Sequence, residues 1–342
     1  MVSFGDTPVI QAPMAGGPST PELTAAVSVA GGYGILAAGY RSPEELRSSI
    51  DRTRALTDAP FGVNLFVPTP PADPAPVAAY ARTLRGDAER LGVPLGAPRW
   101  DDDAFGAKVD LVAATRVHSV SFTFGCPDRP VVDRLHTAGC LVVVTVTSVD
   151  GAREAVLAGA DALCVQGAEA GGHQGGRPGP VANHRTLVDL LTGIGRVTTL
   201  PMIGTGGIMD AADAAGVLRA GAVAVQCGTA FLCTPEAGTP PVHRAALLGH
   251  RFPGTIVTRA YSGRFARGLA NGFAVAHDGD APDAYPEVHH LTRPLRVAAT
   301  RAGDPSVPNL WAGTGWARVT EEPAGDVVRR IAGGAGWDGT PP

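Results

Sequence analysis

An alternation of apolar strands and Ala-rich helical segments dominates the first two thirds of the 342-residue chain and restricts the folds open to it. Each apolar run is nearly continuous, which is typical of parallel strands that are buried on both faces. The expected strands are 8–15, 33–39, 61–66, 119–125, 141–146, 162–167, 202–206 and 222–228. The expected helices between them are 21–30, 43–56, 128–138, 149–158, 184–193 and 210–219. Eight strand–helix units predict an α/β fold, the (β/α)8 TIM barrel.

Two regions break this rhythm. Residues 68–98 are rich in proline around one helical stretch, 75–91, and we expect an excursion after the third strand that covers the barrel mouth. From Gly254 onward the alternation stops. We therefore expect a barrel over residues 1–253 and an α-rich C-terminal cap over residues 254–342, with a return helix to the barrel. The cap is expected to contribute to the substrate pocket.

Composition excludes several classes of protein. The net charge of −4 without a dense Lys/Arg block argues against binding nucleic acid or an anionic membrane. No apolar stretch approaches the roughly 18–20 residues of a membrane span, and the N-terminus lacks a signal-like pattern, so we expect a cytoplasmic protein. The five cysteines lack close metal-ligand spacing, and we expect reduced thiols and no metal site. The sequence leaves the oligomeric state open.

The ends of the seventh and eighth expected strands predict a phosphate cradle. Gly206 and Gly207 follow the seventh strand, and the segment from Gln226 to Thr229 follows the eighth. Glycines let backbone N–H groups approach an anion closely, and barrels of this class bind phosphate at these two strand ends. The similar Gly32-Tyr-Gly34 cluster precedes a strand instead of following one, so we interpret it as a turn.

His173 is the candidate catalytic residue. It follows the sixth expected strand, after Gln166 and the Gly171-Gly172 pair, at the edge where barrel active sites lie. An imidazole can accept the α-proton of a substrate or, when protonated, stabilise a negative charge. The alternative is a histidine that only hydrogen-bonds the backbone. Glu169 either orients His173 or caps the loop, and both roles stay open.

Other polar and aromatic residues carry weaker predictions. Ser121 and Thr123 alternate along the fourth strand, and we favour a structural role for them over a role in the site. Tyr285 and Trp311 are expected either to line the substrate pocket or to serve only in packing.

Motifs along most of the barrel resemble those of the nitronate monooxygenases, flavin mononucleotide (FMN) enzymes on a (β/α)8 barrel. The matching motifs are Gln11-Ala-Pro-Met-Ala15, Gly31-Gly-Tyr-Gly-Ile-Leu36, Phe61-Gly-Val-Asn64, Val120-Ser-Phe-Thr-Phe-Gly125, Gly167-Ala-Glu-Ala-Gly-Gly-His173, Gly204-Thr-Gly-Gly-Ile208 and Gln226-Cys-Gly-Thr229. Three tail motifs, Ser262-Gly-Arg264, Ala266-Arg-Gly268 and Leu310-Trp-Ala-Gly313, resemble the class I branch of this family.

The resemblance implies residue roles and a reaction. The flavin ring would be bordered by Pro13, Met14, Ala15, Asn64, Gln166 and Gly171. The FMN phosphate would be held by Gly206, Gly207, Gln226, Cys227, Gly228 and Thr229, with His173 as the catalytic residue. The implied reaction is oxidative denitrification of a nitronate or nitroalkane with O2, which yields a carbonyl compound and nitrite.

Three alternatives remain at this stage. The nearest is an FMN-dependent NAD(P)H reductase of quinones or enoyl thioesters, although the sequence shows no second phosphate loop and no basic cluster near the flavin motifs. The others are a barrel isomerase that binds a sugar phosphate without flavin, and a flavin-binding protein without catalytic activity.

Overall fold

Eight parallel strands form the barrel in the computed structural model, which describes residues 4–333. Their order around the barrel is β1-β9-β8-β6-β5-β4-β3-β2, and a parallel bridge between Ile10 and Tyr33 joins the two ends. The strands are β1 (Val9–Gln11), β2 (Gly34–Ala37), β3 (Phe61–Phe66), β4 (Ser119–Thr123), β5 (Leu141–Val146), β6 (Ala162–Gln166), β8 (Met202–Thr205) and β9 (Ala224–Cys227). The predicted TIM barrel is confirmed, and each strand lies within its expected range.

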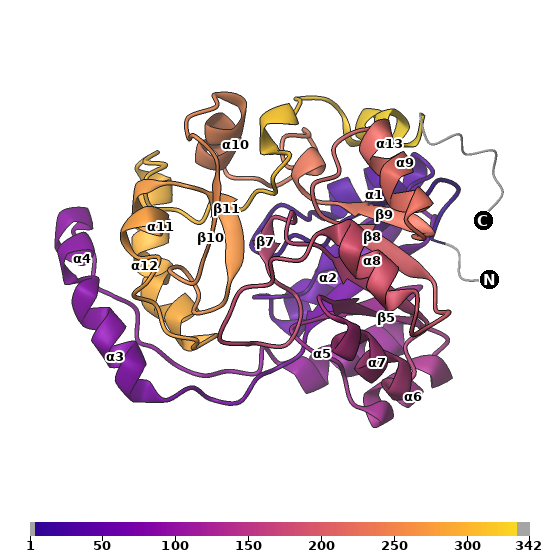
Figure 1. The fold of residues 1–342 in the computed structure, drawn as a ribbon, viewed down its shortest axis with the longest axis horizontal. Helices are drawn as coiled ribbons and strands as arrows, with labels where there is room; N and C mark the ends of the chain where they lie inside the picture. The colour runs from indigo at the N-terminus through magenta and orange to yellow at the C-terminus, as the bar shows by residue number, and fades with distance from the viewer. Residues whose placement is uncertain (1–3, 334–342) are drawn as a thin grey trace.

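Helices surround the barrel (Figure 1), and most of them begin at a residue whose side chain caps the helix. Thr20 accepts a hydrogen bond from the backbone of α1, and Ser42 and Glu45 form a capping box at the start of α2. The helices around the barrel are α1 (Pro21–Val29), α2 (Pro43–Leu56), α5 (Phe105–Thr115), α6 (Arg129–Thr137), α7 (Val149–Ala158), α8 (Leu187–Ile194), α9 (Ala211–Arg219) and α13 (Ala324–Ala332). Helix α5 was not predicted from the sequence. Helix α8 begins at Leu187, three residues after the expected start at residue 184.

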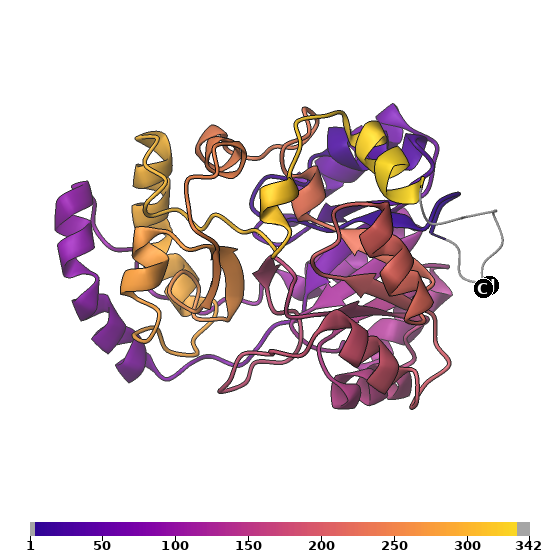
Figure 2. The same cartoon turned by 45° about the horizontal axis from the view of Figure 1, so that its top comes forward.

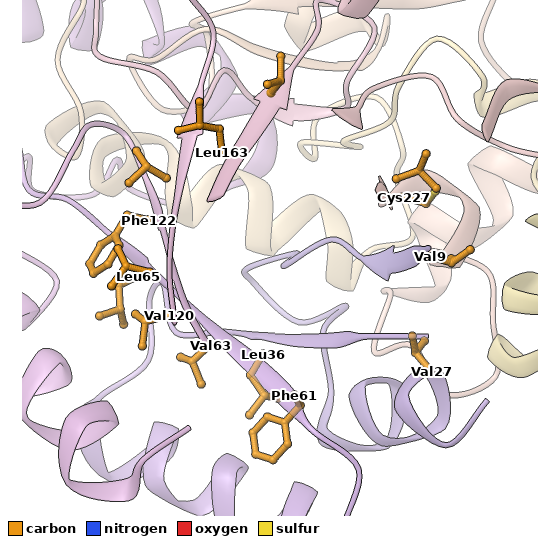
Figure 3. Packing of buried hydrophobic residues seen from close by; sticks show 14 of the residues in the cluster. Val9, Val27, Leu36, Phe61, Val63, Leu65, Val120, Phe122, Leu163 and Cys227 are labelled. Atoms are coloured by element: carbon orange, nitrogen blue, oxygen red, sulfur yellow. The ribbon is translucent and has the colours of Figure 1, made fainter. Parts of the chain in front are cut away.

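Strand residues alternate between two apolar cores. Val9, Val225 and Cys227 face outward and pack with residues of the surrounding helices in the largest apolar cluster (Figure 3). Ile10, Ile35 and their neighbours on other strands form a second cluster, which fills the barrel interior. The Cys227 side chain therefore lies in the outer core, and only its backbone faces the barrel mouth. The four buried cysteines and the partly buried Cys126 are free thiols.

A second layer of elements lies beyond the barrel strand ends. It includes β7 (Gly172–His173), which pairs with β11 (Ala266–Leu269), and β10 (Thr255–Thr258), which pairs with the other edge of β11. The helices here are α3 (Pro74–Thr83), α4 (Arg85–Leu91), α10 (Pro241–Leu248), α11 (Gly272–Ala276) and α12 (Glu287–Arg301), with short 3₁₀ turns at Thr229–Phe231 and Trp316–Arg318. The C-terminal region thus contains a small antiparallel sheet as well as the expected helices.

The proline-rich excursion forms α3 and α4, which lie against α12 at the edge of the molecule farthest from the barrel (Figures 1 and 2). Val77, Tyr80 and Leu84 from the excursion share an apolar cluster with Leu291 and Leu295 of α12. The two segments are far apart in sequence but build one core. Among residues 4–333, no helix is long and apolar enough to cross a membrane.

Candidate active site

A cavity of about 680 Å³ opens at the carboxyl-terminal ends of the barrel strands. Ligand and cofactor sites in proteins usually measure about 300–1,000 Å³, so this cavity can hold a cofactor and a small substrate. All the residues that the sequence analysis assigned to the site line it: Pro13, Met14, Ala15, Asn64, Gln166, Gly171, His173, Gly206, Gly207, Gln226, Cys227, Gly228 and Thr229. Trp311 also lines it.

The turn after β8 has a backbone that only glycine adopts easily. Gly206 has φ of 131° and Gly207 has φ of 73°, and a Cβ on Gly206 would lie 3.0 Å from the backbone nitrogen of Ala170. Within residues 4–333, the backbone N–H groups of Gly207 and Gly228 have no hydrogen-bond acceptor. Gly207 and Gly228 are half-buried and line the cavity, so these two unpaired donors are placed where they suit an anionic ligand.

A segment from the C-terminal region completes this cradle. The backbone N–H of Gly313 donates to Thr229 Oγ1 at 2.9 Å, and the N–H of Thr314 donates to the carbonyl oxygen of Glu169 at 3.0 Å. A Cβ on Gly171 would lie 2.5 Å from the backbone nitrogen of Gly313, so the two chains touch. The Leu310-Trp-Ala-Gly313 motif is recognisable in the sequence, but its place beside the strand ends follows only from the fold.

Asn64 on β3 is oriented by two hydroxyl groups of β4. Ser121 Oγ and Thr123 Oγ1 each donate to Asn64 Oδ1 at 2.9 Å. These two bonds fix the amide so that its Nδ2, which has no protein partner among residues 4–333, can donate to a ligand in the cavity. Ser121 and Thr123 therefore serve the site through Asn64.

Gln166 fixes the loop that carries His173. Its Nε2 donates to the carbonyl oxygen of His173 at 3.0 Å, and its Oε1 accepts from the N–H of Gly175 at 2.6 Å. Of the two roles expected for Glu169, orienting His173 or capping the loop, the structure shows the cap. Its carboxylate accepts from the N–H of Leu187 at 3.1 Å, at the start of α8, so it caps that helix and closes the loop.

The His173 ring lies at the cavity wall among aromatic rings. Its Nε2 is 2.8 Å from Ser262 Oγ, and its centroid is 5.4 Å from Phe124, 5.9 Å from Tyr285 and 5.4 Å from Trp311. Within residues 4–333, Nδ1 has no hydrogen-bond partner. Tyr285 and Trp311 therefore shape the surroundings of His173.

Burial and two arginines keep His173 neutral. Burial lowers the pKa of His173 to about 3, and the positive charges of Arg264 and Arg296 act in the same direction. The imidazole is therefore unprotonated at physiological pH, whereas the imidazolium role considered from the sequence would need the opposite shift. Arg264 lies over the Phe124 ring at 4.0 Å, and its Nε and Nη1 have no partner among residues 4–333.

The site therefore contains buried positive charge that the sequence analysis did not foresee. Arg296 donates only to neutral acceptors, which include Thr292 Oγ1 and Asn309 Oδ1. Burial lowers the pKa of Arg264 and of Arg296 to about 10, so both remain charged at neutral pH. Both come from the C-terminal region, far in sequence from the barrel motifs. Their sequence signal was the Ser262-Gly-Arg264 motif, but nothing in the pattern of α12 singled out Arg296.

Comparison with solved structures finds a close match over nearly the whole chain. A structure titled as a nitroalkane oxidase from Streptomyces ansochromogenes has a TM-score of 0.95 and 45% identity, and it covers 97% of this chain and 96% of its own. FabK from Thermotoga maritima is more distant, with a TM-score of 0.74 and 27% identity over 97% of this chain and 93% of its own.

Sequence comparison gives the same grouping. A Staphylococcus aureus (strain MSSA476) protein named "Probable nitronate monooxygenase" is 35% identical over 95% of this chain and 93% of its own length. The family model described as nitronate monooxygenase matches residues 3–333. With the barrel and the cavity in place, these matches assign the chain, an oxidoreductase, to the nitronate monooxygenase family.

Proposed function

We propose that the protein binds one FMN at the barrel mouth and oxidises nitronates with O2 to a carbonyl compound and nitrite. The free N–H groups of Gly207 and Gly228 would hold the phosphate of FMN, and the Thr229 hydroxyl lies beside them. Asn64 Nδ2 would donate to the flavin ring system. When bound, FMN supplies the electron transfer from the substrate and the reaction with O2.

His173 acts as a general base toward neutral nitroalkanes in this proposal. The Ser262 hydroxyl is 3.3 Å from the carbonyl oxygen of Arg264, to which it can donate, so it can accept from Nε2–H of His173. That arrangement places the ring proton on Nε2 and leaves the lone pair of Nδ1 for the α-proton of the substrate. A preformed nitronate has already lost this proton and does not need the base.

Arg296 stabilises the negative charge of the nitronate oxygens. It lines the cavity, its bonds go to neutral groups, and Arg264 adds positive charge from behind the Phe124 ring. A buried cation without a counter-ion is costly, and an anionic substrate offsets that cost. The single observation that supports the proposal most is this pairing of a neutral His173 with uncompensated positive charge at one cavity.

The proposed function is tested by one spectroscopic experiment. The purified protein should be yellow and release FMN on denaturation. Anaerobic addition of a small nitronate should change the flavin absorbance, and admission of O2 should yield nitrite. A colourless protein, or one that gives no nitrite from any nitronate, would contradict the proposal.

The likeness to FabK favours testing one second function, the reduction of a substrate by NAD(P)H through FMN. The exposed Arg293 and Arg301 line the active-site cavity beside Arg296, so basic partners for a nucleotide diphosphate are present and the reductase needs a direct test. We expect NADH and NADPH to leave the flavin oxidised over minutes under anaerobic conditions. Rapid bleaching by either nucleotide, with no response to nitronate, would establish the reductase instead.

A further inference from the structure

The charged residues that line the active-site cavity all have the same sign. They are Arg293, Arg296 and Arg301, and among residues 4–333 no Asp or Glu lines this cavity. The whole chain, in contrast, has a net charge of −4. The positive charge of the cavity is therefore a local feature that the composition of the chain does not explain.

One face of helix α12 supplies all three arginines. The residues of α12 that line the cavity are 289, 293, 296, 297, 300 and 301, and they recur every three or four positions, as one face of an α-helix does. Another face carries Leu291 and Leu295 and packs against the excursion, so α12 lies between the excursion and the barrel (Figures 1 and 2). Because neutral residues separate the arginines along the chain, no basic run marks them in the sequence.

Two of the three arginines are exposed and unpaired, and we call Arg293 and Arg301 the rim. Both side chains are exposed to solvent although they line the cavity, so they lie at its opening. Among residues 4–333, neither side chain forms an ion pair or a hydrogen bond. Arg296 is less accessible, and its guanidinium donates to Thr292 and Asn309. The rim charges are therefore free to act on a ligand in solution.

Nearby aspartates do not pair with the rim. Arg293 also lines a second cavity of about 310 Å³, which contains three aspartates and two further arginines. Asp101 lies 2.7 Å from His290 Nε2, and Asp103 lies 2.7 Å from Lys108 Nζ. The third aspartate is exposed and accepts from a backbone N–H of its own loop at 3.0 Å. None of the three forms an ion pair with Arg293, which leaves its charge available to the active-site cavity.

Exposed and buried charges act on an anion in different ways. Exposed charges attract over about one Debye length, roughly 10 Å at 0.1 M salt, and added salt screens them, whereas buried charges are screened much less. A cleft lined by one sign of charge can raise the association rate of an oppositely charged ligand by roughly 10–10³-fold. A neutral ligand gains nothing from such a field. An exposed rim of one sign therefore distinguishes ligands by their net charge.

We propose that Arg293 and Arg301 attract anionic nitronates to the cavity from a distance, and that this attraction sets the preference for a nitronate over the neutral nitroalkane of the same carbon skeleton. This inference rests on the proposed function, because it names what selects the substrate of that site. Arg296 then contacts the nitronate oxygens inside the cavity. Proton transfer from a nitroalkane carbon to His173 conserves the charge of the complex, so the rim does not assist that substrate.

The test measures kcat/KM for ethylnitronate and for nitroethane at neutral pH while the ionic strength is raised from about 0.01 to 0.5 M. For the wild type, the value for ethylnitronate should fall about tenfold, whereas the value for nitroethane should stay nearly constant. Sodium chloride and sodium sulfate should give the same decrease at equal ionic strength, because screening depends on ionic strength and competition for a site depends on the anion.

Replacement of both rim residues should remove this salt dependence. At low salt, each single variant, Arg293→Gln or Arg301→Gln, should lose about two- to fivefold in kcat/KM for ethylnitronate, as is usual for one exposed charge pair. The double variant should show at low salt the value that the wild type shows only at high salt. Arg301→Lys keeps the charge but not the planar fork of arginine, and it should keep the wild-type salt dependence.

Arg196→Gln is the matched control. Arg196 is exposed and lies between α8 and β8, at the opposite end of the barrel from the cavity, so this variant changes the net charge equally but far from the rim. It should keep the wild-type salt dependence. An unaltered salt dependence in the double rim variant, or an equal loss in Arg196→Gln, would overturn the proposal. Loss of flavin from the double variant would overturn it too, because the rim would then hold the cofactor.

A binding measurement separates failure of the rim from failure of the proposed function. Acetate shares the planar, anionic two-oxygen head of a nitronate but is not oxidised, and acetamide is its neutral counterpart, so both can be titrated calorimetrically. Weaker acetate binding in the double variant at low salt, with unchanged acetamide binding, would support the rim even if no nitronate were turned over. Equal acetate affinity in both proteins at low salt would refute the rim even if nitrite formed normally.

Discussion

His173 lies among three aromatic rings with a single hydrogen bond to its imidazole, from Nε2 to Ser262. Burial lowers its pKa to about 3, so the ring is unprotonated across the physiological range. Its free Nδ1 is the atom that the proposed proton transfer uses. The lowered pKa and the free Nδ1 both belong to the imidazole ring, so replacement of this ring is the most direct test at the scale of single residues.

Replacement of His173 by Asn should separate the two substrate forms. We expect kcat/KM for neutral nitroethane to fall by roughly 10²–10⁴-fold, the usual contribution of a general base, and kcat/KM for ethylnitronate to fall much less. In the wild type, activity on nitroethane should show no loss near pH 6.5, because the ring protonates only near pH 3. Steady-state nitrite assays from pH 5 to 8 measure both. Equal losses on the two substrates would remove His173 from proton transfer.

At the scale of elements, the strand ends of β8 and β9 and the segment around Gly313 jointly form the cradle. Gly207 and Gly228 offer free N–H groups, and Thr229 Oγ1 anchors Gly313. The pattern of glycines after two neighbouring strands was readable from sequence. The segment around Gly313, which forms the third wall of the cradle, could not be predicted, because its position depends on how this distant part of the chain crosses the barrel mouth.

Thr229→Glu should therefore expel FMN. A carboxylate at this position would lie beside the phosphate and repel it, and it would also lose the hydroxyl that accepts from Gly313 N–H. Thr229→Ser, which keeps the hydroxyl, should retain the flavin. Flavin content per chain after gel filtration measures both variants. Full occupancy in the glutamate variant would show that the phosphate binds elsewhere.

The excursion contributes stability through its contact with α12. Leu84 is fully buried in the cluster that joins the two segments. Leu84→Ala should lower the free energy of unfolding by about 2–5 kcal/mol, as is usual for a large buried side chain replaced by a small one. Leu157→Ala, at a position that is 80% exposed, should change it by less than about 0.5 kcal/mol. Urea denaturation compares them, and similar midpoints would show that the excursion packs loosely.

The elements that could not be predicted from the sequence are those whose formation depends on tertiary contacts. Helix α5 begins without a side-chain cap at Ala104, so the usual start signal is absent. Strand β11 contains Gly268, a poor strand former, and it is a strand because it pairs with β7 and β10. The eight barrel strands, in contrast, carry their apolar pattern locally.

At the scale of the whole molecule, buried histidines couple stability to pH. Burial lowers the pKa of His243 on α10 to about 4, against an ordinary value of 6.5, and a hydrogen bond to the backbone of Trp311 only partly offsets this. Within residues 4–333, its Nε2 has no partner. His173 and His289 have pKa values that are lowered in the same direction by burial.

The sign of this coupling follows from proton uptake. Below pH 6.5 the unfolded chain protonates these histidines while the folded protein does not, so stability is lost as the pH falls from 6.5 toward 4. At pH 5, His243 alone should cost about 2 kcal/mol of the stability present at pH 7.5. His243→Gln should therefore flatten the pH dependence of urea unfolding, whereas replacement of the exposed His184 should not. An unaltered slope in His243→Gln would contradict burial of a neutral ring.

The contact between Gly313 and Thr229 also fixes an order of events during synthesis. All eight barrel strands precede Gly313 in the chain, so the ribosome produces the whole sheet before the segment that closes its mouth, whereas the outer helix α13 follows that segment. Until that segment is made, the strand ends lack one wall and the imidazole of His173 lacks its contact with Trp311. A nascent barrel would therefore be able to fold early yet remain unable to retain its ligand, and maturation of the enzyme would wait for its C-terminal part.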